Sequence, residues 1–181
     1  MIRRSFRNTA ISLIVLFCVV ISTMPAYAVW ETGINVITTA EEQPDKSQDF
    51  DTPEEFAAEV IKLVNSERVN KGLSEFCRME ELCRPAAIRA QESAELFAHI
   101  RPNGSKCSTV YSDCGLTYKA AGENLAYGFS TPADLVKAWM SSKSHRENIL
   151  SANYMYAEAG FFINAEGVIY CSLILYTPKQ T

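Results

Sequence analysis

Apolar and polar residues recur with a helical period near the start of the ordered part of the chain. The stretch Thr-Pro-Glu-Glu at residues 52–55 opens a run whose apolar side chains fall on one helical face. Thr52 is a suitable N-cap, Pro53 suits the first helical position and Glu55 completes a capping box. The pattern predicts a helix that begins after Thr52 and stops at Gly72.

Two more helices are predicted from the same signals. One covers roughly residues 85–97, and one of its sides carries three alanines and a phenylalanine: Ala86, Ala90, Ala94 and Phe97. Such a face indicates close approach to another element. The other begins after Thr131, where Thr-Pro-Ala-Asp repeats the first start signal. Its apolar side predicts that Trp139 is buried against a sheet. Residues 98–122 show no sustained period and are interpreted as a long loop with at most short helical turns.

The end of the chain has the pattern of a β-hairpin. Residues 157–164 and 168–176 are apolar, β-branched or aromatic, and Ala-Glu-Gly joins them. Consecutive apolar residues in both runs indicate strands that are covered on both faces. With three helices available, we expect an α+β fold, a three-layer α-β-α sandwich with a small antiparallel sheet between helices.

The first 28 residues have the pattern of a cleaved signal peptide. Three arginines precede an uncharged apolar run from residue 10 to residue 21, and Ala26-Tyr27-Ala28 follows as a peptidase site. The run is shorter than the roughly 18 to 20 residues that span a bilayer. We therefore expect a secreted, extracellular protein without a transmembrane anchor after cleavage. Residues 29–51 are acidic and aperiodic, which predicts a flexible linker before a domain at 52–181.

Charge and cysteine content narrow the choice of partners. Without the three leader arginines, 14 basic residues face 21 acidic ones, a net charge of −7. This balance argues against nucleic acid or an anionic membrane as a partner. Five cysteines remain, so at least one thiol is unpaired or joined to another chain. Cys107 and Cys114 flank a polar loop and are the favoured disulfide pair. The sequence contains no CxxC doublet, which argues against a metal site built from cysteines.

Three polar residues stand at positions where they could carry chemistry. Ser144 and Glu147 fit a capping box, which would make His145 the first residue of a short helix and keep its imidazole neutral. His99 directly follows the second predicted helix, and Glu123 lies at the far end of the long loop. Taken singly, each also fits an ordinary hydrogen-bonding surface residue.

These residues belong to a series of motifs that resembles the CAP superfamily (cysteine-rich secretory proteins, antigen 5, pathogenesis-related 1), in its bacterial SCP-like branch. Five elements match in order between residues 60 and 176: the opening helix with Leu63-Val64-Asn65-Ser66-Glu67-Arg68, the alanine-rich helix ending in His99, Pro102-Asn103-Gly104, Gly122-Glu123-Asn124, and Trp139 followed by His145-Arg146-Glu147-Asn148-Ile149-Leu150.

The resemblance implies an α-β-α sandwich with a cleft lined by two histidines and two acids, able to hold a divalent cation, commonly zinc. His99, His145 and Glu123 match three of these positions. The fourth position falls on Ser142, so the cleft set here is His, Glu, Ser, His. His99, His145 and Glu123 remain a possible zinc ligand set with open positions.

The resemblance leaves two classes of function open. The first is a non-catalytic extracellular binding module, whose ligand would be a lipid or sterol, a cell-surface component or a protein. The alternative is a metal-dependent or serine-type hydrolase with Ser142 or Ser144 beside His145. Ser144 is better employed as an N-cap, and no G-x-S-x-G turn is visible. A third interpretation is that the polar residues only brace the long loop.

Overall fold

The computed structural model describes residues 52–180, all within one compact unit of the chain. The predicted leader (1–28), the predicted linker (29–51) and Thr181 lie outside the described residues. The elements are α1 (Pro53–Val69), a 3-10 turn (Glu80–Leu82), α2 (Cys83–Glu95), α3 (Thr109–Asp113), β1 (Tyr118–Tyr127), α4 (Pro132–Ser141), α5 (Lys143–Ile149), β2 (Tyr156–Ile163) and β3 (Ile169–Pro178). Among the described helices, none is long and apolar enough to cross a membrane.

The sheet has three antiparallel strands in the order β1-β3-β2. The predicted hairpin is confirmed, because β2 pairs with β3 up to Ile163 and Ile169 at the turn. The prediction that residues 98–122 form one long loop was wrong at its end, because β1 begins at Tyr118. Gly122, Glu123 and Asn124 interrupt the apolar pattern of this strand. The side chains of Glu123 and Asn124 are buried against polar partners and not in an apolar cluster.

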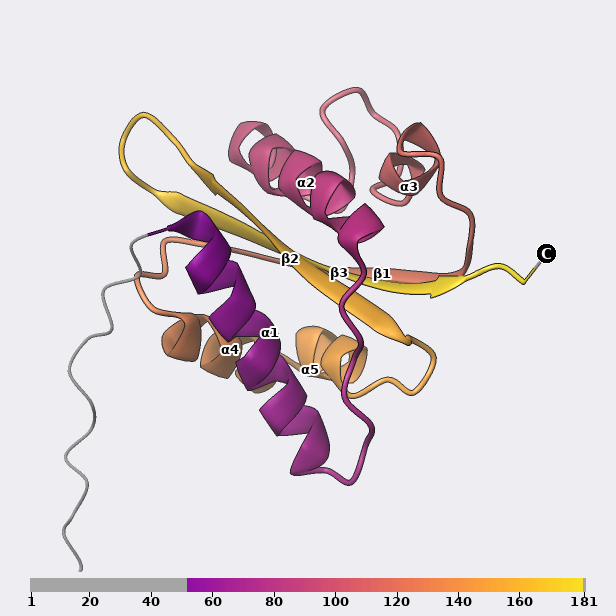
Figure 1. Cartoon of the computed structure of the whole chain (residues 1–181). Coiled ribbons are helices and arrows are strands. Elements are labelled where there is room, and N and C mark those ends of the chain that lie inside the picture. The colour runs from indigo at the N-terminus through magenta and orange to yellow at the C-terminus, as the bar shows by residue number, and fades with distance from the viewer. Residues whose placement is uncertain (1–51, 181) are drawn as a thin grey trace, which may run out of the picture. The chain divides into compact units, whose positions relative to one another are not determined.

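Helices cover both faces of the sheet, as Figure 1 shows: α1, α4 and α5 lie on one side, and α2 and α3 lie on the other. Two apolar clusters fill the two spaces. Leu173 and Leu175 of β3 point into the cluster under α1 and α4, whereas Ile174 between them points into the cluster under α2. The three-layer sandwich predicted from strands that are apolar on both faces is therefore confirmed.

Both predicted helix starts with threonine caps are confirmed. The Thr52 hydroxyl accepts the Glu55 N–H, and the Glu55 carboxylate accepts the Thr52 N–H, which completes the capping box. At the start of α4, the Thr131 hydroxyl accepts the Asp134 N–H and donates to the Asp134 carboxylate. Trp139 of α4 is 1% exposed and donates its indole N–H to the Leu125 carbonyl of β1 at 3.1 Å, so its predicted burial against the sheet is confirmed.

The junction between α4 and α5 differs from the prediction. Ser142 is both the C-cap of α4 and the N-cap of α5, so α5 begins at Lys143. The prediction of Ser144 as N-cap was wrong, because the chain leaves one helix and enters the next through a single extended residue. His145 is consequently the third residue of α5, and no side-chain hydrogen bond caps this helix.

Helix α2 approaches the sheet unusually closely, as its alanine-rich face predicted. Ala86 and Ala90 are fully buried, whereas Phe97 lies beyond the helix end. The Ser172 hydroxyl of β3 donates to the Ala86 carbonyl at 2.7 Å. A Cβ placed on Gly160 of β2 would lie 2.1 Å from the same carbonyl oxygen, so only glycine fits beneath the helix.

We expect Gly160→Ala to lower the free energy of unfolding by about 1–3 kcal/mol, because α2 would be pushed off the sheet. The opposing gain from a stiffer unfolded chain is only about 0.4–1 kcal/mol. Urea denaturation followed by circular dichroism measures the difference. Glu166→Ala in the exposed hairpin turn is the control and should change stability by less than about 0.5 kcal/mol. A Gly160→Ala protein as stable as the parent would contradict this packing.

Candidate functional site

The candidate site lies along β1, which is an edge strand of the sheet. The Gly128 N–H donates to the Ile169 carbonyl at 2.9 Å. From residue 122 onward, the backbone N–H and C=O groups of even-numbered β1 residues therefore point toward β3, and those of odd-numbered residues point away from the sheet. Three outward carbonyls accept side-chain donors instead: Ala121 from Tyr154, Glu123 from Asn148 and Leu125 from Trp139. Side chains from α4, from α5 and from the segment after α5 therefore satisfy the open edge of the sheet.

His145 is held beside this edge by a pair of asparagines. Asn124 of β1 is fully buried and donates its side-chain amide to the His145 carbonyl at 3.1 Å. Its amide oxygen accepts a hydrogen bond from Asn148 at 2.9 Å. The Gly-Glu-Asn stretch and the His-Arg-Glu-Asn stretch, which are distant in sequence, thus form one hydrogen-bonded unit.

His99 reaches the same strand from the opposite helical layer. Its Nδ1 atom lies 2.8 Å from Oε1 of Glu123, whose side chain is only 4% exposed, whereas the His99 side chain is 58% exposed. Since Nδ1 faces the buried carboxylate, Nε2 is the ring nitrogen that remains for a ligand. The structure therefore brings His99 and Glu123 together as predicted from the motifs.

Glu123 is also clamped by Arg89 of α2, a residue that the sequence analysis did not single out. The guanidinium is fully buried and donates from Nε to Oε2 at 2.6 Å and from Nη2 to Oε1 at 3.1 Å. Arg89 further donates to Glu92 and to the carbonyl of Ala98, the residue before His99. The one available signal was its place between Ala86 and Ser93 on the buried face of the helix.

The surroundings change the pKa values of the two histidines in opposite directions. The hydrogen bond to Glu123 raises the pKa of His99 above its ordinary value. Burial, and then the charge of His99, lower the pKa of His145. The prediction of a neutral His145 has the right direction, with burial as the largest cause. Burial alone would raise the pKa of Glu123, but the hydrogen bonds from His99 and Arg89 outweigh it and hold that pKa low.

The three residues expected to bind a metal do not fit a three-ligand zinc site in this arrangement. Both carboxylate oxygens of Glu123 already accept hydrogen bonds, and the buried guanidinium of Arg89 would repel a cation placed beside them. Across residues 52–180, no group of three or more His, Cys, Asp or Glu side chains is placed to hold a metal ion. His99 and His145 alone would leave zinc one short of the three protein ligands usual in catalytic sites.

The remaining predicted site residues are placed less suggestively. The Ser142 hydroxyl lies 3.5 Å from the Ser144 hydroxyl, and neither serine makes a hydrogen bond to a histidine within the described part of the chain. Cys107 and Cys114 are both half-buried, and the disulfide between them stays a prediction. Burial raises the pKa of the Cys107 thiol, which makes it a poor nucleophile at neutral pH.

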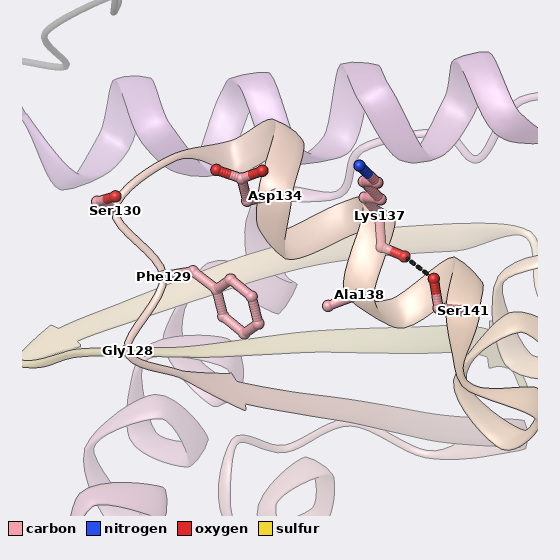
Figure 2. Close-up of a pocket in the computed structure, with 7 residues that line it drawn as sticks. All are labelled: Gly128, Phe129, Ser130, Asp134, Lys137, Ala138 and Ser141. Carbon is pink, nitrogen blue, oxygen red and sulfur yellow. Dashed lines mark hydrogen bonds between the residues drawn. The ribbon is translucent and has the colours of Figure 1, made fainter.

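An open depression of about 510 Å³, lined by none of these residues, lies between the loop after β1 and the exposed side of α4. Figure 2 shows Phe129 lying beneath the helix while Asp134 and Lys137 project outward. The Ser141 hydroxyl donates to the Lys137 carbonyl. The lining contains no histidine, cysteine or buried ionisable group, so it offers little chemistry of its own.

Comparison with known sequences identifies a matching family and similar proteins. Residues 61–157 match the family described as the cysteine-rich secretory protein family, CAP. The uncharacterized protein YkwD of Bacillus subtilis is 32% identical over 142 residues, which cover 77% of this chain and 55% of that protein. The uncharacterized membrane protein YlbC of the same organism is 23% identical over 104 residues, covering 56% of this chain and 30% of that protein. The chain thus spans about half or less of these curated relatives.

Solved structures share the fold at low sequence identity. An extracellular protein containing a SCP domain from Bacillus anthracis superimposes with a TM-score of 0.61 at 17% identity, over 69% of this chain and 43% of that one. An outer surface protein of Borrelia burgdorferi superimposes with a TM-score of 0.62 at 16% identity, over 67% of this chain and 92% of that one. A cysteine-rich secretory protein of Staphylococcus aureus superimposes with a TM-score of 0.58 at 21% identity, over 70% of this chain and 39% of that one.

We expect His99 to titrate at higher pH than His145, and Glu123→Gln to lower the pKa of His99 while changing His145 far less. The raised pKa adds stability that is fully present below the unfolded value of about 6.5 and is lost as pH rises through the folded value. Solvent screening keeps this contribution small, since the ring is more than half exposed. Proton NMR of the two imidazoles, with Glu166→Gln as control, measures both values. An unchanged His99 pKa in Glu123→Gln would contradict the pairing.

Proposed function

The chain belongs to the CAP family of cysteine-rich secretory proteins, and from that premise we propose that it works outside the cell as a binding module that holds its ligand at His99. The observation that carries the proposal is the exposed imidazole fixed from beneath by a buried carboxylate. The extracellular and outer-surface descriptions of two structural neighbours support the location. So does the leader pattern at residues 1–28.

The neighbours of His99 suggest the class of ligand. Three large apolar residues lie within three positions of it in the sequence and are exposed to solvent: Leu96 at 42%, Phe97 at 49% and Ile100 at 52%. The Phe97 ring packs edge-on against Tyr127 of β1, with 4.7 Å between ring centres. A polar ring nitrogen beside an exposed apolar surface suits a ligand with an apolar body and a polar head. Among the partners that the family resemblance suggests, a lipid or sterol fits this surface best.

One observation favours the alternative, an extracellular hydrolase. An imidazole oriented by a buried carboxylate is the arrangement of the general base in serine hydrolases. A serine nucleophile would have to lie within hydrogen-bond reach of the base, but the contact made by the Ser142 hydroxyl is with Ser144. A metal-dependent route meets the crowded carboxylate of Glu123. The geometry therefore supports binding better than catalysis.

We expect the protein to bind a fluorescent fatty acid or a fluorescent sterol, measured by fluorescence anisotropy. His99→Ala removes the polar contact and Phe97→Ala the apolar one, so each should weaken binding by about tenfold, the effect of about 1.4 kcal/mol. Val69→Ala, which removes an apolar side chain of similar exposure at the end of α1, is the matched control and should bind like the parent.

The same proteins should show no turnover of peptide or ester libraries, with or without added zinc or EDTA. Turnover that disappears in the His99→Ala/His145→Ala double variant would establish the hydrolase and overturn the binding module. Probe binding that His99→Ala leaves unchanged would move the ligand elsewhere on the domain. A fall in melting temperature without any change in binding would leave the cluster a structural brace.

A further inference from the structure

The buried carboxylate of Glu123 is neutralised by an internal cation. The Arg89 guanidinium contacts both of its oxygens, and neither side chain is more than 4% exposed. A two-point contact of this kind fixes the plane of the carboxylate as well as its charge. Oxygen Oε1 then has one direction left, and the Nδ1 atom of His99 lies in it at 2.8 Å.

Other bonds make Arg89 a rigid part of the site. Its Nη1 atom donates to Glu92 at 2.6 Å, and its Nη2 atom donates to the Ala98 carbonyl at 2.9 Å. Glu92 in turn pairs with Arg101, which also pairs with Asp113 of α3. One guanidinium therefore orients the carboxylate and also tethers the backbone directly before His99.

We propose that Arg89 is the positioning residue of this site and that its guanidinium binds the Glu123 oxygens that a metal ion would need. His99 then acts as a hydrogen-bonding imidazole without a metal. The inference goes beyond the proposed binding function and does not depend on the ligand. It concerns only how the chain satisfies one buried carboxylate.

The physical reason is the cost of separating a buried ion pair. For Glu123 to bind a cation, it would have to give up Arg89 and leave a fully buried guanidinium partly unpaired, or accept the cation beside that guanidinium. Both options are unfavourable in a medium of low dielectric constant. Without Arg89, the same carboxylate would lie beside His99 with no cation bound to it, and the two side chains are ligands that zinc accepts.

The experiment is a zinc titration of the full domain, read by competition with a chromophoric chelator. We expect Arg89→Met, a neutral side chain of similar length, to bind zinc at least about tenfold more tightly than the parent, within the range over which changes around metal sites alter affinity. The gain should be lost in Arg89→Met/Glu123→Gln. Arg89→Lys retains a cation and should bind zinc no better than the parent.

Cobalt(II) in place of zinc supplies a readout that a purely structural role would not affect. Visible absorption typical of nitrogen and oxygen ligands should appear in Arg89→Met and be absent from both the parent and the double variant. Circular dichroism and melting temperature identify any variant that has not folded.

Several results would overturn the inference. One is a folded Arg89→Met protein that binds zinc no more tightly than the parent; another is a gain that Arg89→Met/Glu123→Gln retains. If Arg89→Met does not fold, the parent and Glu123→Gln decide, since tight zinc binding by the parent that Glu123→Gln removes would show that Glu123 is a metal ligand despite Arg89. None of these results depends on the lipid and sterol probes, so the proposed function succeeds or fails separately.

Discussion

The buried ion pair between Arg89 and Glu123 joins one helical layer to the edge strand of the sheet, and the candidate site depends on it. It fixes the carboxylate that orients His99, and the same guanidinium holds the backbone at Ala98. Removing one partner of a buried pair typically costs about 3–5 kcal/mol, because the other charge stays buried. The pair therefore links the stability of α2 on the sheet to the geometry of the exposed imidazole. Gly160 and Ser172 let the same helix lie close to the strands.

The second constraint is the open edge of β1. An uncovered edge strand invites pairing with other chains, and its outward carbonyls need donors. Trp139 and Asn148 supply two of those donors, and Asn124 binds the backbone of His145. The residues that satisfy the edge are thus the residues that place the second histidine. This explains why a tryptophan and an asparagine accompany the histidine motif in the sequence.

Much of the fold could be predicted because its signals are local. Threonine caps, the hairpin turn and strands that are apolar on both sides each depend on a few neighbouring residues, and together they imply the three layers. Strand β1 was missed because Glu123 and Asn124 read as loop residues when their partners on α2 and α5 are unknown. Arg89 was missed for the same reason, since an arginine on a helix usually faces solvent. The motifs identified His99, Glu123 and His145. Sequence spacing could not reveal that Arg89 forms an ion pair with the Glu123 carboxylate.

The site divides into a constrained part and a free part. Arg89, Glu123 and Asn124 are buried and hydrogen-bonded, so substitutions there disturb the domain itself. Leu96, Phe97 and Ile100 are exposed and belong to neither apolar cluster, so their size and shape can change at little cost in stability. These residues lie within three positions of His99 in the sequence, so under the proposed function they are the ones that could change the ligand while the scaffold stays the same. The fold therefore holds one imidazole through buried, hydrogen-bonded groups, while the exposed residues next to it in the sequence are under weaker constraint from stability.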